Sequence, residues 1–418
     1  MNTIIQTDVS SEIGELEAVI IHTPGPEVEN MTPGNAERAL YSDILNLSVA
    51  QKEYSLLEKV LGKFAKVFKV KEMLIETLNN ERVKKNLVDR ICKNENIQDI
   101  REYLIERSKE ELADLLIEGI VMHKNTLTRF LSKERYSMPP LHNFFFTRDA
   151  AIPVLDTVFI SNMANKIRER ESIIMEAIFD FSGIFKTKTH STIHPDPAVT
   201  IEGGDVLVAR EDILLIGNGE RTSSQGIDLI LEILRKQNKI KRHIIVQELP
   251  RSPESFIHLD MVFSFLDTDC CMVYEPVIFK TSKYQTVHIT IENGKVSCIR
   301  EQRNIPEALS RLGMDLKPVF CGGNSDPWIQ EREQWHSAAN FFAVAPGKVI
   351  GYARNTYTLE EMSKSGFEII SAKDIISGKA DPDQYKKLLI SLEGSELPRG
   401  GGGARCMTMP VKRKTVNW

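Results

Sequence analysis

The hydrophobic pattern divides the 418 residues into a helical stretch and flanking stretches of shorter period. Within residues 73–135, apolar side chains such as Leu112 and Leu116 recur three and four positions apart among many charged residues, and proline is absent. This period is typical of amphipathic helices. We therefore expect an inserted helical domain at 73–135, with 1–72 and 136–418 forming the two parts of one α/β domain.

The first part of this α/β domain is expected to open with a strand. Residues 12–24 combine an apolar run with the start of a Pro-Gly-Pro turn, which predicts a strand that ends at the turn. A polar loop at 30–41 follows, and we expect it to cap a helix that runs over 43–61.

After residue 140 the pattern becomes modular. Two modules each contain two short apolar runs joined by a polar turn and then a helical segment; their paired runs span 150–161 and 206–216. The modules share a register, because Asn162 comes 13 positions after Asp149 and Asn218 comes 13 positions after Asp205. Each therefore predicts a strand pair followed by a helix.

Two further modules begin at His258 and Gly322. An apolar stretch over 261–279 follows the first, while a helix, two strands near 341–352 and another helix follow the second. Repeated units of strand, strand, helix and strand predict an α/β, propeller-like assembly in which the starts of the units converge.

Composition narrows the functional classes. The chain has 53 basic and 58 acidic side chains, a net charge of -5, and no basic block interleaved with aromatic residues, which argues against a nucleic-acid partner. No apolar stretch approaches the roughly eighteen residues of a membrane span, and the N-terminus lacks the pattern of a signal peptide. We expect a cytoplasmic protein without a membrane partner.

The cysteines do not indicate disulfides or a metal. None of the six forms a CxxC pair or a zinc-ligand spacing, and the adjacent Cys270 and Cys271 lie in a strand-like run that suits buried thiols. Cys406 differs because it follows four glycines near the end of the chain. Such a loop can fold tightly over a ligand, so Cys406 is a candidate nucleophile, although free cysteines are more often inert core residues.

The starts of the modules supply the partners that such a nucleophile requires. They carry Asp149, Glu202, His258 and Asp260. Taken singly, each of these residues is more commonly a turn cap or a structural core residue than a catalytic group. Together, His258 can serve Cys406 as acid and base while Glu202 orients it, and the two remaining aspartates suit a planar cation that needs bidentate carboxylates, a guanidinium.

Several motifs in this order resemble the arginine deiminases. They are Phe-Thr-Arg-Asp149, Glu-Gly-Gly-Asp205, His-Leu-Asp-Met-Val-Phe263 and the glycine-rich loop before Cys406-Met-Thr, together with Asn30-Met-Thr-Pro33. The resemblance covers nearly the full length. It implies a five-unit pseudo-symmetric α/β propeller of the pentein superfamily with its active site at the centre, and hydrolysis of L-arginine to L-citrulline and ammonia without a cofactor or metal. We also expect a homo-oligomer.

The resemblance also assigns roles by position. Asp149 and Asp260 would hold the guanidinium, and Glu202 with His258 would serve binding and proton transfer beside Cys406. The implied substrate-binding residues also include Asn143, Phe146, Arg168 and Arg221, with the amide and the two arginines at the amino-acid end of the substrate.

One position departs from the family pattern. Arginine deiminases usually carry an arginine five residues before the nucleophile, where this chain has Gly401, flanked by Arg399 and Arg405. Either arginine could substitute, or the substrate end could be held differently. The alternatives are therefore a hydrolase of another guanidine, an amidinotransferase using the same residues, or a non-enzymatic pentein, which would not need this nucleophile and its partners.

Overall fold

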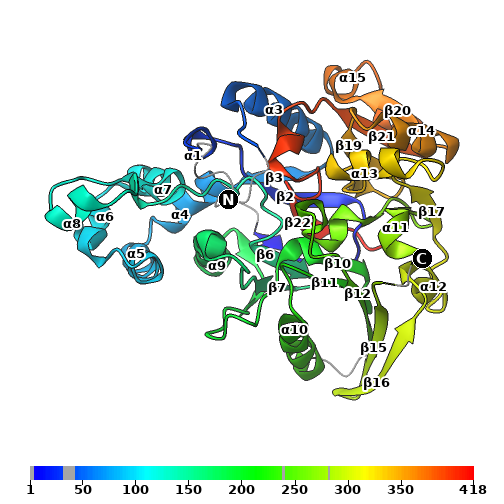
Figure 1. Ribbon diagram of the computed structural model, residues 1–418, viewed down its shortest axis with the longest axis horizontal. Helices are drawn as coiled ribbons and strands as arrows, with labels where there is room; N and C mark the ends of the chain where they lie inside the picture. Colours follow the sequence, from blue (N-terminus) through cyan, green and yellow to red (C-terminus); the bar gives the residue numbers. More distant parts are fainter. Residues whose placement is uncertain (1–3, 32–42, 238–240, 281–282) are drawn as a thin grey trace.

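The computed structural model describes residues 4–31, 43–237, 241–280 and 283–418, and it shows a mixed α/β protein (Figure 1). Most of the polar loop predicted at 30–41 lies outside the described residues. The predicted helix is present as α3, Leu47–Phe64, but it begins four residues later than expected. The side chain of Asn46 accepts a hydrogen bond from the Val49 N–H and so caps the first turn.

The first two predicted modules form sheets of one pattern. In each, an antiparallel pair is followed by a helix and by a third strand parallel to the second. The first comprises β6 (Ala151–Val154), β7 (Thr157–Ile160), α9 (Glu169–Phe181) and β9 (Lys188–Ser191). The second comprises β10 (Val206–Arg210), β11 (Ile213–Asn218), α10 (Ser224–Gln237) and β12 (Arg242–Glu248).

The third and fourth modules repeat the antiparallel pair with a parallel neighbour. The third contains β13 (Phe263–Phe265), β14 (Cys270–Val273), α11 (Glu275–Ile278), α12 (Ile305–Ser310) and β17 (Lys317–Phe320). The fourth contains α13 (Pro327–Trp335), β18 (Phe342–Ala345), β19 (Lys348–Tyr352), α14 (Thr356–Lys364), β20 (Glu368–Ser371), α15 (Ala372–Ser377) and β21 (Leu388–Leu392).

The two ends of the chain meet in one further sheet. Strand β22 (Met409–Arg413) pairs antiparallel with β2 (Leu16–Ile21), and β2 pairs parallel with β3 (Lys66–Lys69). The short helix α1 (Pro26–Glu29) and α3 lie between β2 and β3 in the chain. Cys406 comes just before β22, so this pairing fixes the loop that carries it.

One hairpin was not predicted. Strands β15 (Thr286–Glu292) and β16 (Lys295–Gln302) are joined at Asn293 and Gly294, both with positive φ, and extend the second sheet beyond β12. Asn-Gly between alternating strands is a strong hairpin signal, and it was present in the sequence.

The helices of the predicted insertion project to one side of the molecule (Figure 1). They are α4 (Val70–Thr77), α5 (Glu81–Glu95), α6 (Arg101–Ile105), α7 (Lys109–Glu118) and α8 (Leu127–Leu131), and the short strands β4 (Ile120–Val121) and β5 (Tyr136–Met138) pair antiparallel with each other. Leu112 and Leu116 are fully buried in a hydrophobic cluster that also includes Ile174 of α9 and Ile20 of β2. The lobe thus shares its core with the α/β part. The short strands β1 (Ile5–Gln6) and β8 (Phe185–Lys186) pair parallel nearby.

Candidate active site

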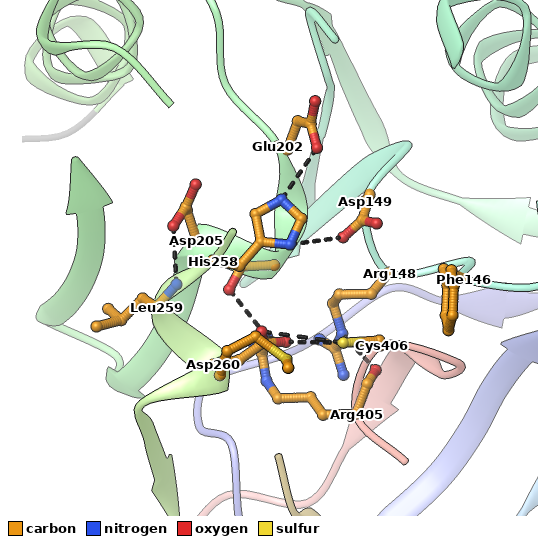
Figure 2. Close-up of polar contacts among 12 residues, drawn as sticks. Phe146, Arg148, Asp149, Glu202, Asp205, His258, Leu259, Asp260, Arg405 and Cys406 are labelled. Carbon is orange, nitrogen blue, oxygen red and sulfur yellow. Dashed lines mark hydrogen bonds and ion pairs between the residues drawn. The ribbon is translucent and has the colours of Figure 1, made fainter. Parts of the chain in front are cut away.

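Short turns at the starts of two modules bring Glu202 and His258 together. Glu202 precedes the 3₁₀ turn Gly203–Asp205, and His258 precedes the 3₁₀ turn Leu259–Met261. His258 Nε2 lies 3.0 Å from Glu202 Oε2, and His258 Nδ1 lies 3.7 Å from Asp149 Oδ1 (Figure 2). All three side chains are buried. The structure therefore places three of the predicted residues in one cluster.

The cluster favours a charged histidine. Burial lowers the pKa of His258, but Asp149, the hydrogen bond with Glu202 and nearby Asp205 outweigh it and raise the pKa to about 9. Burial raises the pKa of Glu202, but His258, Arg221 and Arg168 outweigh it and lower the pKa to about 2. At neutral pH the pair is an imidazolium and a carboxylate, so His258 carries a proton that it can donate.

Cys406 lies beside Asp260. Its Sγ is 3.7 Å from Asp260 Oδ2 and 4.0 Å from Oδ1 (Figure 2). Burial raises the pKa of the Cys406 thiol well above its ordinary value, and the carboxylates of Asp260 and Asp149 raise it further, while Arg405 partly offsets them. Burial is the largest of these causes. The thiol is therefore protonated until a cation reaches the two aspartates.

Arg405 is locked in a buried ion-pair network. Its guanidinium binds Glu12 through two hydrogen bonds of 3.0 Å and donates a third, of 2.8 Å, to Asp260 Oδ2. Burial raises the pKa of Glu12, but Arg405 and Arg148 outweigh it and lower the pKa to about 2. Arg405 therefore orients Asp260 by binding its Oδ2. Glu12 lies 394 positions before Cys406 in the chain, and no local pattern in the sequence marked it.

Arg168 supports Asp149 in the same way. Its Nη1 donates to Asp149 Oδ2 at 2.8 Å, and its Nε and Nη2 both bind Glu171. Nη2 also lies 3.4 Å from the backbone oxygen of Asn143, which is buried alongside. The other oxygen of Asp149, Oδ1, is buried without a hydrogen-bond partner among the described residues. One oxygen of this aspartate thus remains for a ligand.

Glycines permit the close packing of this site. A Cβ on Gly204 would lie 2.4 Å from His258 Nδ1, and one on Gly402 would lie 2.5 Å from the ring of Phe146 and 3.0 Å from the Cβ of Cys406. Only a residue without a side chain fits such contacts. Phe146, one of the predicted substrate-binding residues, therefore lies directly against the loop of Cys406, the candidate nucleophile.

Asn340 is a further site residue that the sequence did not reveal. Its side-chain oxygen accepts hydrogen bonds from the backbone N–H groups of Arg405 and Cys406 at 2.9 and 3.2 Å, and its amide nitrogen donates to the backbone oxygen of Asp260 at 3.1 Å. This buried amide therefore holds Cys406 and Asp260 at a fixed separation. A single asparagine 66 positions before the nucleophile gives no signal in one sequence.

Arg221 lies at a pocket beside the Glu202–His258 pair. The pocket has a volume of about 300 Å³, and its walls include Arg221, Ala164 and Ile257. The Ala164 N–H donates to Glu202 Oε1 at 3.0 Å, and Ile257 is next to His258 in the chain. The pocket therefore adjoins the catalytic candidates.

The cluster also has the composition of a cation site. Asp149, Glu202 and His258 each offer a ligand atom, and these atoms lie within 4.8 Å of one another. A metal would compete with the bonds that His258 makes to Glu202 and that Arg168 makes to Asp149. An organic cation can instead donate hydrogen bonds to the carboxylate oxygens and leave these existing contacts in place.

Comparison with known proteins identifies the family. The arginine deiminase family matches residues 37–413, and an arginine deiminase of Bacillus cereus is 33% identical over 429 aligned positions, covering 98% of each chain. The chain belongs to the arginine deiminase family. This membership confirms the predicted resemblance and the predicted enzyme class, a hydrolase that acts on arginine.

Solved structures show the fold. An amidinotransferase of saxitoxin biosynthesis from Microseira wollei matches with a TM-score of 0.54 at 13% identity, covering 99% of this chain and 98% of that one. The N-terminal domain of ArgZ, a cyanobacterial arginine dihydrolase, matches with a TM-score of 0.53 at 13% identity, covering 95% and 98%. These neighbours are pentein-fold enzymes, so the arginine deiminase homologue described here shares that mixed α/β fold. Among its described helices, none has the length and apolar character needed to cross a membrane.

Proposed function

We propose that the protein hydrolyses L-arginine to L-citrulline and ammonia through a covalent intermediate on Cys406. The observation that carries the proposal is the state of the two aspartates. Asp149 and Asp260 each have one oxygen bound by an arginine of the chain itself, Arg168 and Arg405, and each has the second oxygen next to His258 or Cys406. Two half-satisfied carboxylates beside a thiol suit a planar guanidinium.

Binding of the substrate also activates the nucleophile. The guanidinium brings a positive charge to Asp149 and Asp260, whose negative charges, with burial, raise the pKa of the Cys406 thiol. Neutralising them favours loss of the thiol proton to solvent. The thiolate then attacks the guanidinium carbon, and a neutral tetrahedral adduct forms.

His258 completes the first half of the reaction. Protonated His258 transfers its proton to one terminal nitrogen of the adduct, the C–N bond breaks, and ammonia leaves. The carbon remains bonded to Cys406 as a positively charged S-alkylthiouronium. Glu202 stabilises the imidazolium before this transfer through its 3.0 Å contact with Nε2.

Water completes the second half. Neutral His258 takes a proton from a water molecule that replaces ammonia, and the hydroxide adds to the thiouronium carbon. The adduct collapses, the C–S bond breaks, and the hydroxyl proton passes to the sulfur. Citrulline and the Cys406 thiol are released, and His258 is again protonated.

The remaining substrate contacts and the architecture belong to the same proposal. We place Asn143, Arg168 and Arg221 at the amino-acid end of arginine and Phe146 among the other substrate contacts, while Arg168 also holds Asp149. We also propose that the five sheets with an antiparallel pair and a parallel neighbour form a pseudo-symmetric propeller. Residues 73–135 are its helical insertion, and the enzyme is a cytoplasmic homo-oligomer.

Incubating purified enzyme with L-arginine as the only substrate tests this function. We expect citrulline and ammonia in equal amounts. An amidinotransferase would instead expel ornithine as its thiouronium forms and would pass the remaining amidino group to an added amine, so it would make no citrulline. Absence of citrulline under these conditions, with product formation restored by an amine, would overturn the hydrolase assignment.

A further inference from the structure

The pocket beside Glu202 and His258 contains a second cation besides Arg221. Arg251 also lines it, on the loop that leads to His258, and Glu220 lines it as well. Neither Arg221 nor Arg251 forms an ion pair within the described parts of the chain, and the Arg221 Nε is buried without a hydrogen-bond partner there. Two arginines that form no ion pair within the described residues, at a pocket of about 300 Å³, are suited to bind an anion.

The two arginines that flank Gly401 in the chain already have carboxylate partners. Arg405 is buried and bonded to Glu12 and Asp260. The Arg399 guanidinium binds Asp43 and Glu396. Neither Arg399 nor Arg405 lines this pocket. They are therefore poor substitutes for the arginine that the family usually carries at the position of Gly401.

The binding requirements of an α-amino acid match the three charged residues of the pocket. Its carboxylate needs donors, which Arg221 and Arg251 supply, and its ammonium needs an acceptor, which Glu220 supplies. The pocket adjoins the pair that handles the guanidinium, because Ala164 in its wall donates to Glu202. The pocket therefore lies next to the carboxylate that pairs with His258.

We infer that Arg251 is a specificity-determining residue, which together with Arg221 binds the substrate α-carboxylate while Glu220 receives the α-ammonium. This inference rests on the proposed function. It restricts the substrate class to free L-arginine, in preference to a guanidine without the carboxylate, such as agmatine, or an Nα-acylated arginine.

Steady-state kinetics of Arg251→Ala with three substrates test the inference. A hydrogen bond to a charged group corresponds to a change in binding of about 10- to 150-fold, so KM for L-arginine should rise by that factor while kcat stays within about threefold. The variant's kcat/KM for agmatine, which has no carboxylate, should equal that of the wild type. Arg251→Lys should recover part of the loss, because it keeps the charge without the planar fork.

Two matched variants complete the experiment. Arg399→Ala removes an arginine close to Gly401 and should leave KM for L-arginine unchanged. Glu220→Gln should raise KM for L-arginine. It should leave kcat/KM for Nα-acetyl-arginine, which lacks the ammonium, as low as in the wild type. An unchanged KM in Arg251→Ala, or an increase only in Arg399→Ala, would overturn the inference while the wild type still makes citrulline. A wild type that makes no citrulline would instead refute the proposed function itself.

Discussion

At the scale of single residues, Asp149 and Asp260 each serve an internal arginine and, in our proposal, the substrate. Arg168 and Arg405 are buried cations that orient one carboxylate each, and Glu171 and Glu12 bind the opposite sides of those arginines. This arrangement fixes both aspartates before a substrate arrives, so little ordering is needed at the moment of binding. The internal arginines also compensate charges that would otherwise be costly to bury.

The aspartates can be tested by removing one charge at a time. Asp149→Asn and Asp260→Asn should each lower kcat/KM for L-arginine by a factor of about a hundred or more, since breaking a buried charge pair costs roughly 3 to 5 kcal/mol. Asp156→Asn, at an exposed turn of the same module, is the matched control and should keep normal activity. Near-normal kcat/KM in either site variant would show that the aspartate is only a structural cap at the start of a strand.

The sequence identified the residues that carry unusual chemistry better than those that support them. Cys406, His258 and Asp260 stand out because a nucleophile, an acid and carboxylates form a recognisable set. Asn340 and Glu12 did not, because their roles depend on backbone groups and on Arg405, which only the folded chain brings near them. Such supporting contacts leave no pattern in a single sequence.

At the scale of elements, the site depends on the short turns and loops that precede strands. Two 3₁₀ turns, at Gly203–Asp205 and Leu259–Met261, position Glu202 and His258. Asp205 ties the two turns together, because its Oδ1 accepts a 2.9 Å hydrogen bond from the Leu259 N–H. The glycine loop over 400–403 lets the chain next to Cys406 pack closely against Phe146.

Adding one methyl group to this loop tests its packing. In Gly402→Ala the new Cβ would collide with Phe146 and press on Cys406, so we expect kcat/KM to fall by about a hundredfold, the cost of a 1 Å misplacement of reacting groups. Gly401→Ala is the control, because nothing lies within 4 Å of its Cβ and only its positive φ of 85° opposes the change. Equal activity in the two variants would contradict the role of close packing.

The sequence predicted elements well where local signals agree. The strand pairs of the first two modules follow from short apolar runs joined by a polar turn, and the helix α9 from the helical segment after the first pair. The helix α3 was expected to start at residue 43, capped by the polar loop over 30–41, whereas Asn46 makes the capping bond. The pairing of β2 with β22 joins residues almost 400 positions apart, which no local signal can indicate.

At the scale of the whole molecule, His258 links the active site to stability. Its pKa is raised from 6.5 to about 9 in the folded protein, with Asp149, Glu202 and Asp205 facing it. A group whose pKa rises on folding binds its proton more tightly in the native state. The stability that this proton contributes is therefore complete below pH 6.5 and is lost as pH rises through about 9.

The difference in thermal stability between wild type and His258→Gln isolates this contribution. We expect the wild type to have the higher Tm at pH 6, and the advantage to shrink steadily between pH 6.5 and 9. Taking a difference reduces the influence of other groups, such as Asp205, whose pKa burial raises to about 7. A Tm difference that stays constant over this range would show that His258 is not protonated in the native protein.

Rapid acid quenching followed by peptide mass spectrometry tests most directly whether Cys406 forms a covalent intermediate with arginine. During turnover of L-arginine, the peptide containing Cys406 should gain the mass of arginine less that of ammonia, whereas the exposed Cys298 should remain unmodified. Cys406→Ala should show no adduct and no citrulline. Continued citrulline formation by Cys406→Ala above about a thousandth of the wild-type rate, or an adduct on another cysteine, would contradict the account.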